Sequence, residues 1–312
     1  MRIARILAAT AVSLVAVAAL GGSASADGKA WTAAKAGLPA DTKFVIGIDV
    51  ATVQKTQLFA TYYPKLHEKP EAAKVLDAIK DGCKLDPVSV VQSVVFAAAD
   101  DDEDGAVYVA VTGIDKTRLS SCLQATAKTD DKDAKVAIKH NGNITEVTKG
   151  AETVYFGWVG KDVLVVPFRA KDKPALTKWM GGKGALAKSD LGKTLAKVNT
   201  SATVWGVGHG TKEIQPGVNA KGGYGAINYT KGMLNADIHA VMENAEQASA
   251  MATQATQQLD QAKNGMLPAE FVAMIKALII TSDKEEVRIK ANVAEKDVLG
   301  ALAFALSTFG GP

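Results

Sequence analysis

A short acidic segment carries the residues of this chain that come nearest to a metal site. Asp100, Asp102, Asp104 and Gly105 have the D-x-D-x-D-G spacing with which calcium-binding loops begin, and carboxylate oxygens are ligands that Ca²⁺ prefers. A complete EF-hand loop would need a bidentate glutamate about seven residues after Asp104, where this chain has Val111. We therefore predict a solvated acidic hairpin tip and no metal site, with calcium binding as the alternative.

Two glycine-containing segments have part of a nucleotide-binding pattern. Residues 206–210 (GVGHG) follow an expected strand, but Thr211 stands where the fingerprint G-x-G-x-x-G needs its last glycine. Residues 192–194 (GKT) end like a P-loop, but Ala187 replaces the first glycine of that motif. We predict a flexible loop over residues 206–210 and no nucleotide cofactor.

The other residue types form no catalytic pattern along the sequence. No histidine belongs to an H-x-x-x-H or H-E-x-x-H pair, so we predict no zinc site. The chain has no G-x-S-x-G nucleophile elbow, and we assign no catalytic residue. A triad or a carboxylate pair that assembles only in three dimensions stays open. The histidines are His67, His140, His209 and His239.

The first residues have the layout of a cleavable export signal. Arg2 and Arg5 precede an apolar stretch over residues 6–20, and residues 24–26 (ASA) form an A-x-A cleavage site ahead of Asp27. An apolar segment of about 15 residues is too short to remain as a membrane span. No later apolar run is long enough either. We expect a soluble protein, exported to the periplasm or beyond, without a transmembrane anchor.

The chain has two cysteines, Cys83 and Cys122. In an oxidising compartment an isolated pair most simply forms a disulfide. Closing a loop of about 40 residues should stabilise the fold by roughly 4 kcal/mol in the chain-entropy model. Two free reactive or metal-binding thiols are the alternative, but no C-x-x-C spacing and no nearby histidine supports it. We predict the Cys83–Cys122 disulfide.

Charge and composition narrow the range of partners. The formal net charge is +3, and it falls nearly to zero when Arg2 and Arg5 leave with the signal. A balance so close to neutral gives no reason to expect nucleic acid or an anionic membrane as a partner. Because 47% of the residues are hydrophobic, the chain can form one large core or two smaller ones.

The order of expected elements indicates an α+β fold. Strand, helix, helix, strand, strand and helix are expected in residues 43–128 and again in residues 234–306. Apolar and polar residues alternate over residues 286–293, which predicts an antiparallel sheet with one solvated face. We therefore expect antiparallel sheets with helices packed on one face, in two related lobes. The expected divisions are a signal peptide at 1–26, an N-terminal lobe at 27–198 and a C-terminal lobe at 199–312.

Residues 244–263 form the most unusual of the expected helices. One interpretation is a partner-binding helix or a lid over an apolar groove. The other is a helix that packs closely on a neighbour through its small residues. The narrow apolar stripe on which both depend consists of Ala248, Met251, Ala252, Ala255, Leu259 and Ala262.

Four segments around the two cysteines carry a resemblance to a known family. They are residues 81–87 (DGCKLDP), 93–95 (SVV), 111–115 (VTGID) and 119–123 (LSSCL). They resemble exported proteins of unknown function from Gram-negative bacteria, in which a cysteine-glycine-x-Asp-Pro-like turn precedes a hairpin and a second cysteine lies in the next helix. Here Gly82 precedes Cys83 instead of following it. Most of the mature chain is similar to duplicated α+β domains of unknown function. The resemblance implies export, the disulfide and a duplicated fold, and it supplies no activity.

A binding role is the function that these observations favour. We predict a non-catalytic protein of the cell envelope that binds or scaffolds an envelope protein whose identity the sequence does not indicate. The alternative is a periplasmic carrier whose small apolar ligand lies between a curved sheet and the helix at residues 244–263. A third hypothesis is an envelope hydrolase, which requires Asp, Glu, His or Ser residues clustered in one cleft.

Overall fold

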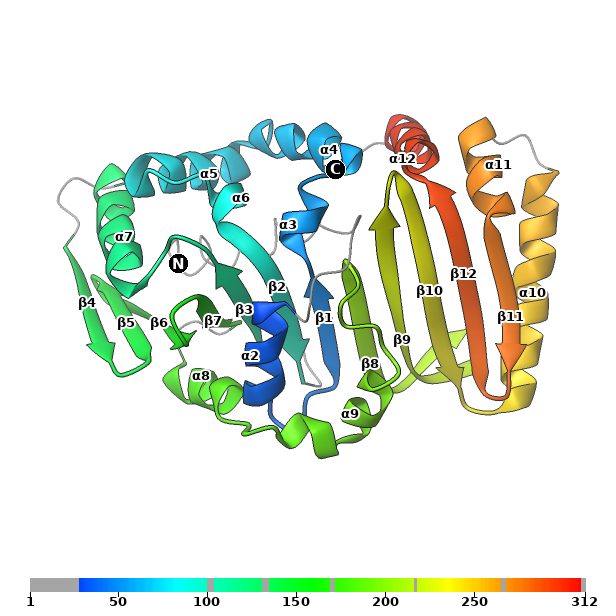
Figure 1. Ribbon diagram of the computed structural model, residues 1–312, viewed down its shortest axis with the longest axis horizontal. Coiled ribbons are helices and arrows are strands. Elements are labelled where there is room, and N and C mark those ends of the chain that lie inside the picture. Colours follow the sequence, from blue (N-terminus) through cyan, green and yellow to red (C-terminus); the bar gives the residue numbers. More distant parts are fainter. Residues whose placement is uncertain are drawn as a thin grey trace.

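The computed structural model describes residues 28–99, 104–130, 135–168, 172–215, 218–264 and 268–309. The expected signal at 1–26, together with Asp100 and Asp102, lies outside these described residues. The described strands form one antiparallel sheet with helices packed around it, which confirms the α+β class (Figure 1). In sheet order its twelve strands are β11 (Leu278–Asp283), β12 (Glu286–Ala294), β10 (Met233–Met242), β9 (Val218–Thr230), β8 (Val204–Gln215), β1 (Phe44–Ile48), β2 (Val91–Ala98), β3 (Gly105–Val111), β7 (Val163–Pro167), β6 (Glu152–Val159), β5 (Ile144–Lys149) and β4 (Val136–Asn141).

Helices begin where the sequence supplies suitable first residues. Pro70 occupies the first turn of its helix, and Asn244 caps the longest of the described helices by accepting a hydrogen bond from the N–H of Gln247 at 2.9 Å. No helix in the described part of the chain is long and apolar enough to span a membrane. The helices are α2 (Lys29–Gly37), α3 (Val50–Val53), α4 (Gln57–His67), α5 (Pro70–Cys83), α6 (Pro87–Val90), α7 (Lys116–Asp130), α8 (Lys173–Met180), the 3₁₀ turn η1 (Ala185–Lys188), α9 (Asp190–Leu195), α10 (Ala245–Lys263), α11 (Ala269–Lys276) and α12 (Glu295–Phe309).

The sheet continues across the boundary expected between residues 198 and 199. β1 pairs with β2 on one side and with β8 on the other. A strand of the expected C-terminal lobe is therefore hydrogen-bonded directly to a strand of the expected N-terminal lobe. The expected boundary therefore lies within a continuous sheet, and the division into two lobes stays a prediction.

The expected order of elements is present in both halves, but the strands pair differently. In the N-terminal half β1 pairs with β2, and β2 pairs with β3. In the C-terminal half β10 pairs with β12, and β11 lies beyond β12 at the edge of the sheet. In the first hairpin the earlier strand, β2, lies next to the preceding strand, whereas in the second hairpin the later strand, β12, does. The structure does not confirm a structural repeat.

Residues 206–210 were predicted as a flexible loop, and this prediction is wrong. They lie within β8, where Gly206 pairs with Gly225 of β9. Trp205 and Val207 point to the opposite face and are buried. Because the glycines add no side chains to their own face, the apolar alternation that marks a strand is hidden in the sequence.

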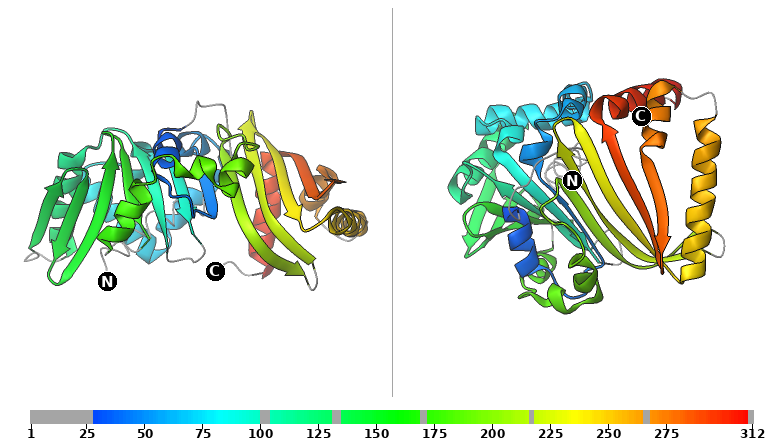
Figure 2. Two further views of the ribbon diagram at one scale, coloured as in Figure 1. Left: turned by 90° about the horizontal axis from the view of Figure 1, so that it is seen from below. Right: turned by 45° about the vertical axis from the view of Figure 1, so that its right-hand side comes forward.

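The main core lies on the sheet face that α2, α8, η1 and α9 cover, which we call the α2 face (Figures 1 and 2). Trp31 and Ala34 of α2 are buried there, together with Val45 of β1. Tyr108 of β3 connects the sheet to α8, because its hydroxyl donates a hydrogen bond to the backbone carbonyl of Trp179. This core fixes α2 against the ends of the central strands.

The other face of the sheet, which we call the α10 face, carries separate smaller clusters. α3 and α6 pack over β1, β2 and β3, and α7 packs over the strands beside them. Ala248 and Ala252 of α10 are buried against Met242 and Val287. Close packing through small residues is therefore confirmed at these two positions.

The predicted disulfide is present. Cys83, the last residue of α5, is bonded to Cys122 of α7, and their Cα atoms lie 4.4 Å apart. The bond joins two helices on the α10 face that are separated in sequence by β2 and β3. It therefore joins the helix that precedes the β2–β3 hairpin to the helix that follows it.

Candidate functional site

A cavity of about 440 Å³ lies at one end of the central strands. Its walls come from the start of α2, the end of β1, the start of β2 and the turn before β8. Trp31, Asp49, Gln92 and Ser201 represent these four segments. The pairing of β1 with both β2 and β8 is what brings the segments together.

Two tryptophans form part of the apolar wall of the cavity. Trp31 and Trp205 meet edge to face, with ring centroids 4.7 Å apart. Gly47 lies under the indole of Trp205, where any β-carbon would overlap the ring. A glycine inside a strand often marks such a close approach. This aromatic pair is therefore held by the backbone of β1 as well as by α2.

Polar side chains also line the cavity. The Ser93 hydroxyl accepts a hydrogen bond from the N–H of Ala30 at 3.3 Å, which ties the first turn of α2 to β2. The Ser201 hydroxyl donates to the side-chain oxygen of Asn199 at 2.7 Å. Gln92 adds a carboxamide from β2. Apolar walls with a few converging polar groups are typical of small-molecule sites.

The charged groups of the lining already have protein partners. The ammonium of Lys29 forms an ion pair with Asp162. The carboxylate of Asp49 caps α3, accepting hydrogen bonds from the backbone N–H of Thr52 at 3.2 Å and from its hydroxyl at 2.6 Å. Thr52 carries no charge, so Asp49 remains an anion beside the cavity, whereas the charge of Lys29 is paired with that of Asp162.

Asp104, the one aspartate of the acidic segment that the structure describes, is engaged with α8. One carboxylate oxygen accepts a hydrogen bond from the indole N–H of Trp179 at 2.9 Å, and the other lies 2.7 Å from the ammonium of Lys178. Within the described ranges, no three histidine, cysteine or acidic side chains are placed to hold a metal ion. The calcium alternative depends on Asp100 and Asp102, which lie outside those ranges.

A serine, a histidine and a threonine form the arrangement that comes nearest to a catalytic triad. The Ser120 hydroxyl lies 3.2 Å from Nε2 of His140, and Nδ1 of His140 lies 3.0 Å from the hydroxyl of Thr145. The hydrogen of Ser120, however, is donated to the backbone carbonyl of Lys116 at 2.7 Å. Ser120 can then only accept from a protonated Nε2, the tautomer opposite to that of a general base. The arrangement is a structural tie between α7 and β4.

The other histidines do not converge. His67 ends α4 with its ring 5.6 Å from that of Tyr63, and His209 lies within β8. His239 lies on β10, on the solvated face of the C-terminal strands. The structure thus brings none of the four histidines to the same place as another.

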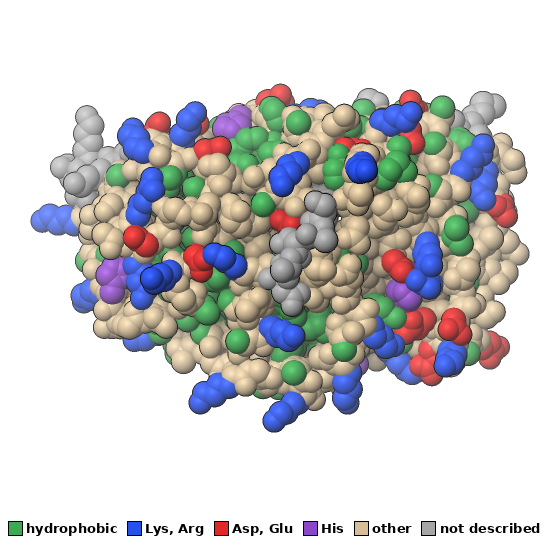
Figure 3. Space-filling view, viewed as in Figure 1, with side chains coloured by type: hydrophobic (Ala, Val, Ile, Leu, Met, Phe, Trp, Pro, Cys, Tyr) green, Lys and Arg blue, Asp and Glu red, His purple; other side chains and the backbone are tan. Residues whose placement is uncertain are grey.

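A charged cluster surrounds His239. Its Nδ1 lies 2.9 Å from a Glu286 oxygen, and its Nε2 lies 3.1 Å from an Asp237 oxygen. Arg288 makes a two-pronged contact with Asp237, with Nε at 2.7 Å, and the ring of Tyr224 stacks on the imidazole with centroids 4.4 Å apart. Acidic and basic side chains around a histidine are visible over the C-terminal strands in Figure 3.

The electrostatics of this cluster centre on Glu286. Partial burial disfavours its charged form, but hydrogen bonds from Lys197, Tyr224 and His239 outweigh burial and lower the pKa of Glu286 to about 2. A hydrogen bond from Arg288 likewise lowers the pKa of Asp237. Every charge faces an opposite one, so the cluster neutralises itself. We assign it a structural role across β9, β10 and β12.

The sequence contained a usable signal for this cluster. The predicted alternation of β12 is confirmed, because Val287 and Val293 are buried whereas Lys290 and Asn292 are exposed. The same alternation placed Glu286 and Arg288 on the solvated face. Their partners on β10 required the strand register, which pairs Arg288 with His239.

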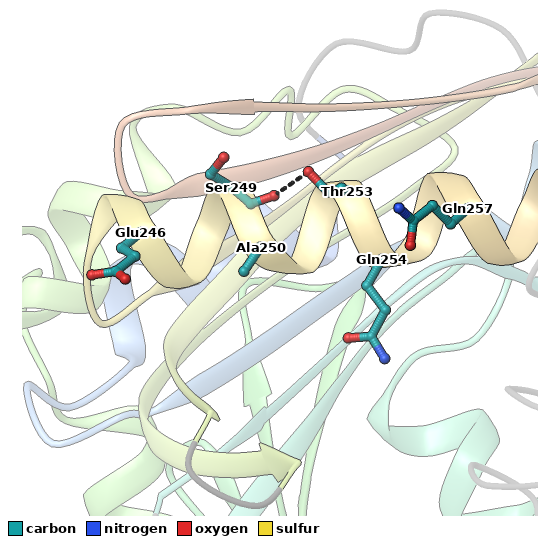
Figure 4. A pocket seen from close by; sticks show the side chains of 6 residues that line it. All are labelled: Glu246, Ser249, Ala250, Thr253, Gln254 and Gln257. Atoms are coloured by element: carbon teal, nitrogen blue, oxygen red, sulfur yellow. Dashed lines mark hydrogen bonds between the residues drawn. The ribbon is translucent and has the colours of Figure 1, made fainter.

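A broader hollow of about 580 Å³ lies along α10. All six of its lining side chains belong to that one helix, as Figure 4 shows. Most of them are exposed, and the Thr253 hydroxyl donates back to the carbonyl of Ser249 at 2.9 Å, as is usual on a helix surface. A surface formed by one helix cannot enclose a ligand. We therefore take the smaller cavity as the candidate site.

No protein-family model and no curated protein matches this chain. Among solved structures, crystal form III of TP0453 matches with a TM-score of 0.50 at 9% identity, over 86% of this chain and 96% of that one. Crystal form I of the same protein matches with a TM-score of 0.46 at 9% identity, over 86% and 95%. The first match shows that the folds are alike. At such low identity it transfers no function.

Proposed function

We propose that this chain is an exported, non-catalytic protein of the cell envelope that binds a small ligand in its central cavity. The observation that carries the proposal is the cavity itself, a space of about 440 Å³ lined by two tryptophans and by hydroxyl and amide side chains. Its size falls within the range of known small-molecule sites.

Two features support export. The first residues have the layout of a cleavable signal, and Cys83 and Cys122 form a disulfide. Disulfides persist in oxidising compartments and are rare in the reducing cytosol. Ligand binding would therefore take place outside the cytosol, in the periplasm or beyond.

The packing of α10 moves the candidate site away from where the carrier hypothesis placed it. That hypothesis put an apolar ligand between the sheet and residues 244–263. Ala248 and Ala252 contact the strands directly there and are almost completely buried. The contact fills the space in which such a ligand would lie, so we place the ligand in the central cavity.

Purification from an exporting host tests both parts of the proposal. We expect mature protein whose N-terminus is Asp27, recovered from the envelope fraction with no free thiols. Native mass spectrometry should show a small co-purified ligand. A substitution that fills the cavity, Ala51→Phe, should abolish the added mass, whereas Ala250→Phe on the exposed side of α10 should not. Unprocessed protein in the cytosol with two reduced cysteines would contradict the export part. Native protein without any bound mass, in every growth condition tried, would contradict the binding part.

A further inference from the structure

The chemistry of the cavity lining narrows the class of ligand. Lys29 and Asp49 are the charged residues among the described lining residues. Lys29 forms an ion pair with Asp162, whereas Asp49 accepts its hydrogen bonds from the neutral Thr52 and keeps its negative charge. An anionic ligand in this cavity would need a cation that is not already paired. The one cation of the described lining, Lys29, is paired with Asp162, and the carboxylate of Asp49 repels an anion, so the ligand that fits carries no negative charge.

The polar groups of the lining can both donate and accept hydrogen bonds. Ser93 uses an acceptor position for the N–H of Ala30, which leaves its hydroxyl hydrogen to donate to a ligand. Ser201 donates its hydrogen to Asn199, which leaves its oxygen to accept. The Gln92 amide nitrogen donates to the Ser89 carbonyl at 3.4 Å, which leaves its second hydrogen to donate and its oxygen to accept. A ligand that meets them all must itself carry several groups that both donate and accept, as alcohols do.

The tryptophans require an apolar surface on the same ligand. Trp31 and Trp205 line the cavity beside Val94, and each is only 3% exposed, so they offer a small apolar surface to a ligand. A fully apolar ligand would match this wall but would leave the hydroxyls of Ser93 and Ser201 without partners, at a cost in affinity. A compact ring with C–H groups on its faces and hydroxyls around its edge satisfies both parts of the lining.

We propose that the cavity binds a neutral saccharide ring, either a free monosaccharide or the terminal unit of a glycan. The inference rests on the proposed function, since it names the ligand class for the same site. The ring C–H groups lie against Trp31 and Trp205. The ring hydroxyls exchange hydrogen bonds with Ser93, Gln92 and Ser201.

Titration of the mature, disulfide-bonded protein with defined sugars tests the inference. Glucose, galactose and N-acetylglucosamine serve as neutral probes, measured by calorimetry and by tryptophan fluorescence. We expect at least one to bind saturably, with glucuronate at least tenfold weaker because its carboxylate meets no unpaired cation and lies near Asp49. The linear trimer of N-acetylglucosamine separates the two sources: tighter binding of the trimer indicates a glycan end, and its exclusion indicates a free sugar.

Two variants and their matched controls locate the binding. Gln92→Ala should weaken binding about tenfold, the usual effect of losing one good hydrogen bond. Ala51→Phe should abolish binding by filling the cavity. Gln257→Ala and Ala250→Phe, on the exposed side of α10, should leave it unchanged. Thermal melting of each variant shows whether it is folded, and Gln92→Ala decides the outcome if Ala51→Phe is not.

The outcomes separate failure of the inference from failure of the proposed function. Binding of dodecanoate but of no sugar would overturn the saccharide assignment and leave a binding protein. Sugar binding that survives both cavity variants would overturn the assignment of the site. If no probe binds and no ligand co-purifies, both the inference and the proposed function are wrong.

Discussion

The buried carboxylate of Glu295 accepts a hydrogen bond from the backbone N–H of Leu58 at 2.7 Å, across 237 residues of sequence. Its second oxygen accepts from the hydroxyl of Tyr229, also at 2.7 Å. Glu295 is the first residue of α12 and is only 2% exposed. One side chain thus joins the start of α4, the strand β9 and the start of α12.

We predict that Glu295→Gln destabilises the protein by about 1–3 kcal/mol, because an amide cannot accept both hydrogen bonds and one buried donor loses its partner. Urea denaturation gives the change. Glu246→Gln, on the exposed first turn of α10, is the control and should cost less than about 1 kcal/mol. Equal stabilities of Glu295→Gln and the unsubstituted protein would show that this contact contributes nothing.

Gly47→Ala should be more harmful than an ordinary glycine substitution in a strand. A β-carbon at this position overlaps the Trp205 indole, which is itself buried. We expect a loss of about 2 kcal/mol or more from the forced displacement, together with a change in tryptophan emission. At Gly208 a β-carbon would lie 3.6 Å from Phe44, an ordinary contact, so Gly208→Ala should be neutral or stabilising. Similar melting temperatures for the two variants would refute the close approach.

The depressed pKa of Glu286 predicts how stability depends on acid. The pKa in the folded protein is about 2, below the ordinary value of 4.5, so the folded state holds this proton less tightly than the unfolded chain. The resulting stability is complete above about pH 4.5 and is lost as the pH falls toward 2. After a discount for solvent screening we expect about 1–2 kcal/mol at neutral pH.

Glu286→Gln should therefore lower the free energy of unfolding at pH 7 and converge with the unsubstituted protein near pH 2. Urea titrations at several pH values measure both. Glu285→Gln, on the same turn with an exposed partner in Lys221, should change stability by less than about 0.5 kcal/mol at any pH. A constant difference between Glu286→Gln and the unsubstituted protein over the whole range would contradict the assigned pKa.

The disulfide should make a large contribution to stability. It closes a loop with a sequence separation of 39 residues. In the chain-entropy model a bond of this span is worth about 4 kcal/mol, so Cys83→Ala with Cys122→Ala should lower the urea midpoint strongly. Dithiothreitol should lower the melting temperature of the unsubstituted protein and leave the double variant unaffected. If reduction has no effect on the unsubstituted protein, the bond is not contributing.

Local patterns were enough to predict several elements of this fold. Alternation over residues 286–293 indicated β12 and its solvated face, because a strand turns its side chains to alternate sides. Pro70 indicated the start of α5. The Cys83–Cys122 pair followed from there being no other cysteines to bond. Each of these inferences needs only the types of neighbouring residues or the number of cysteines in the chain.

Local patterns could not predict the glycine-rich part of β8 or the order of the strands in the sheet. Residues 206–210 were mistaken for a loop because glycine carries no side chain to show the alternation, although backbone pairing with β9 keeps them in a strand. The insertion of β12 between β10 and β11 could not be predicted either. Strand order depends on which strands pair with one another. Alternating apolar and polar residues show that a segment is a strand, but they do not show which neighbour it pairs with.

The sequence by itself determined the α+β class, the disulfide partners and the charge balance, because these depend on residue type and short spacing. Only the tertiary structure decided the candidate site. Trp31, Gly47 and Trp205 meet because β1 pairs with both β2 and β8, and the contact between Glu295 and Leu58 likewise joins distant segments. Such contacts arise from the packing of the whole chain, so no local spacing of residues could specify them.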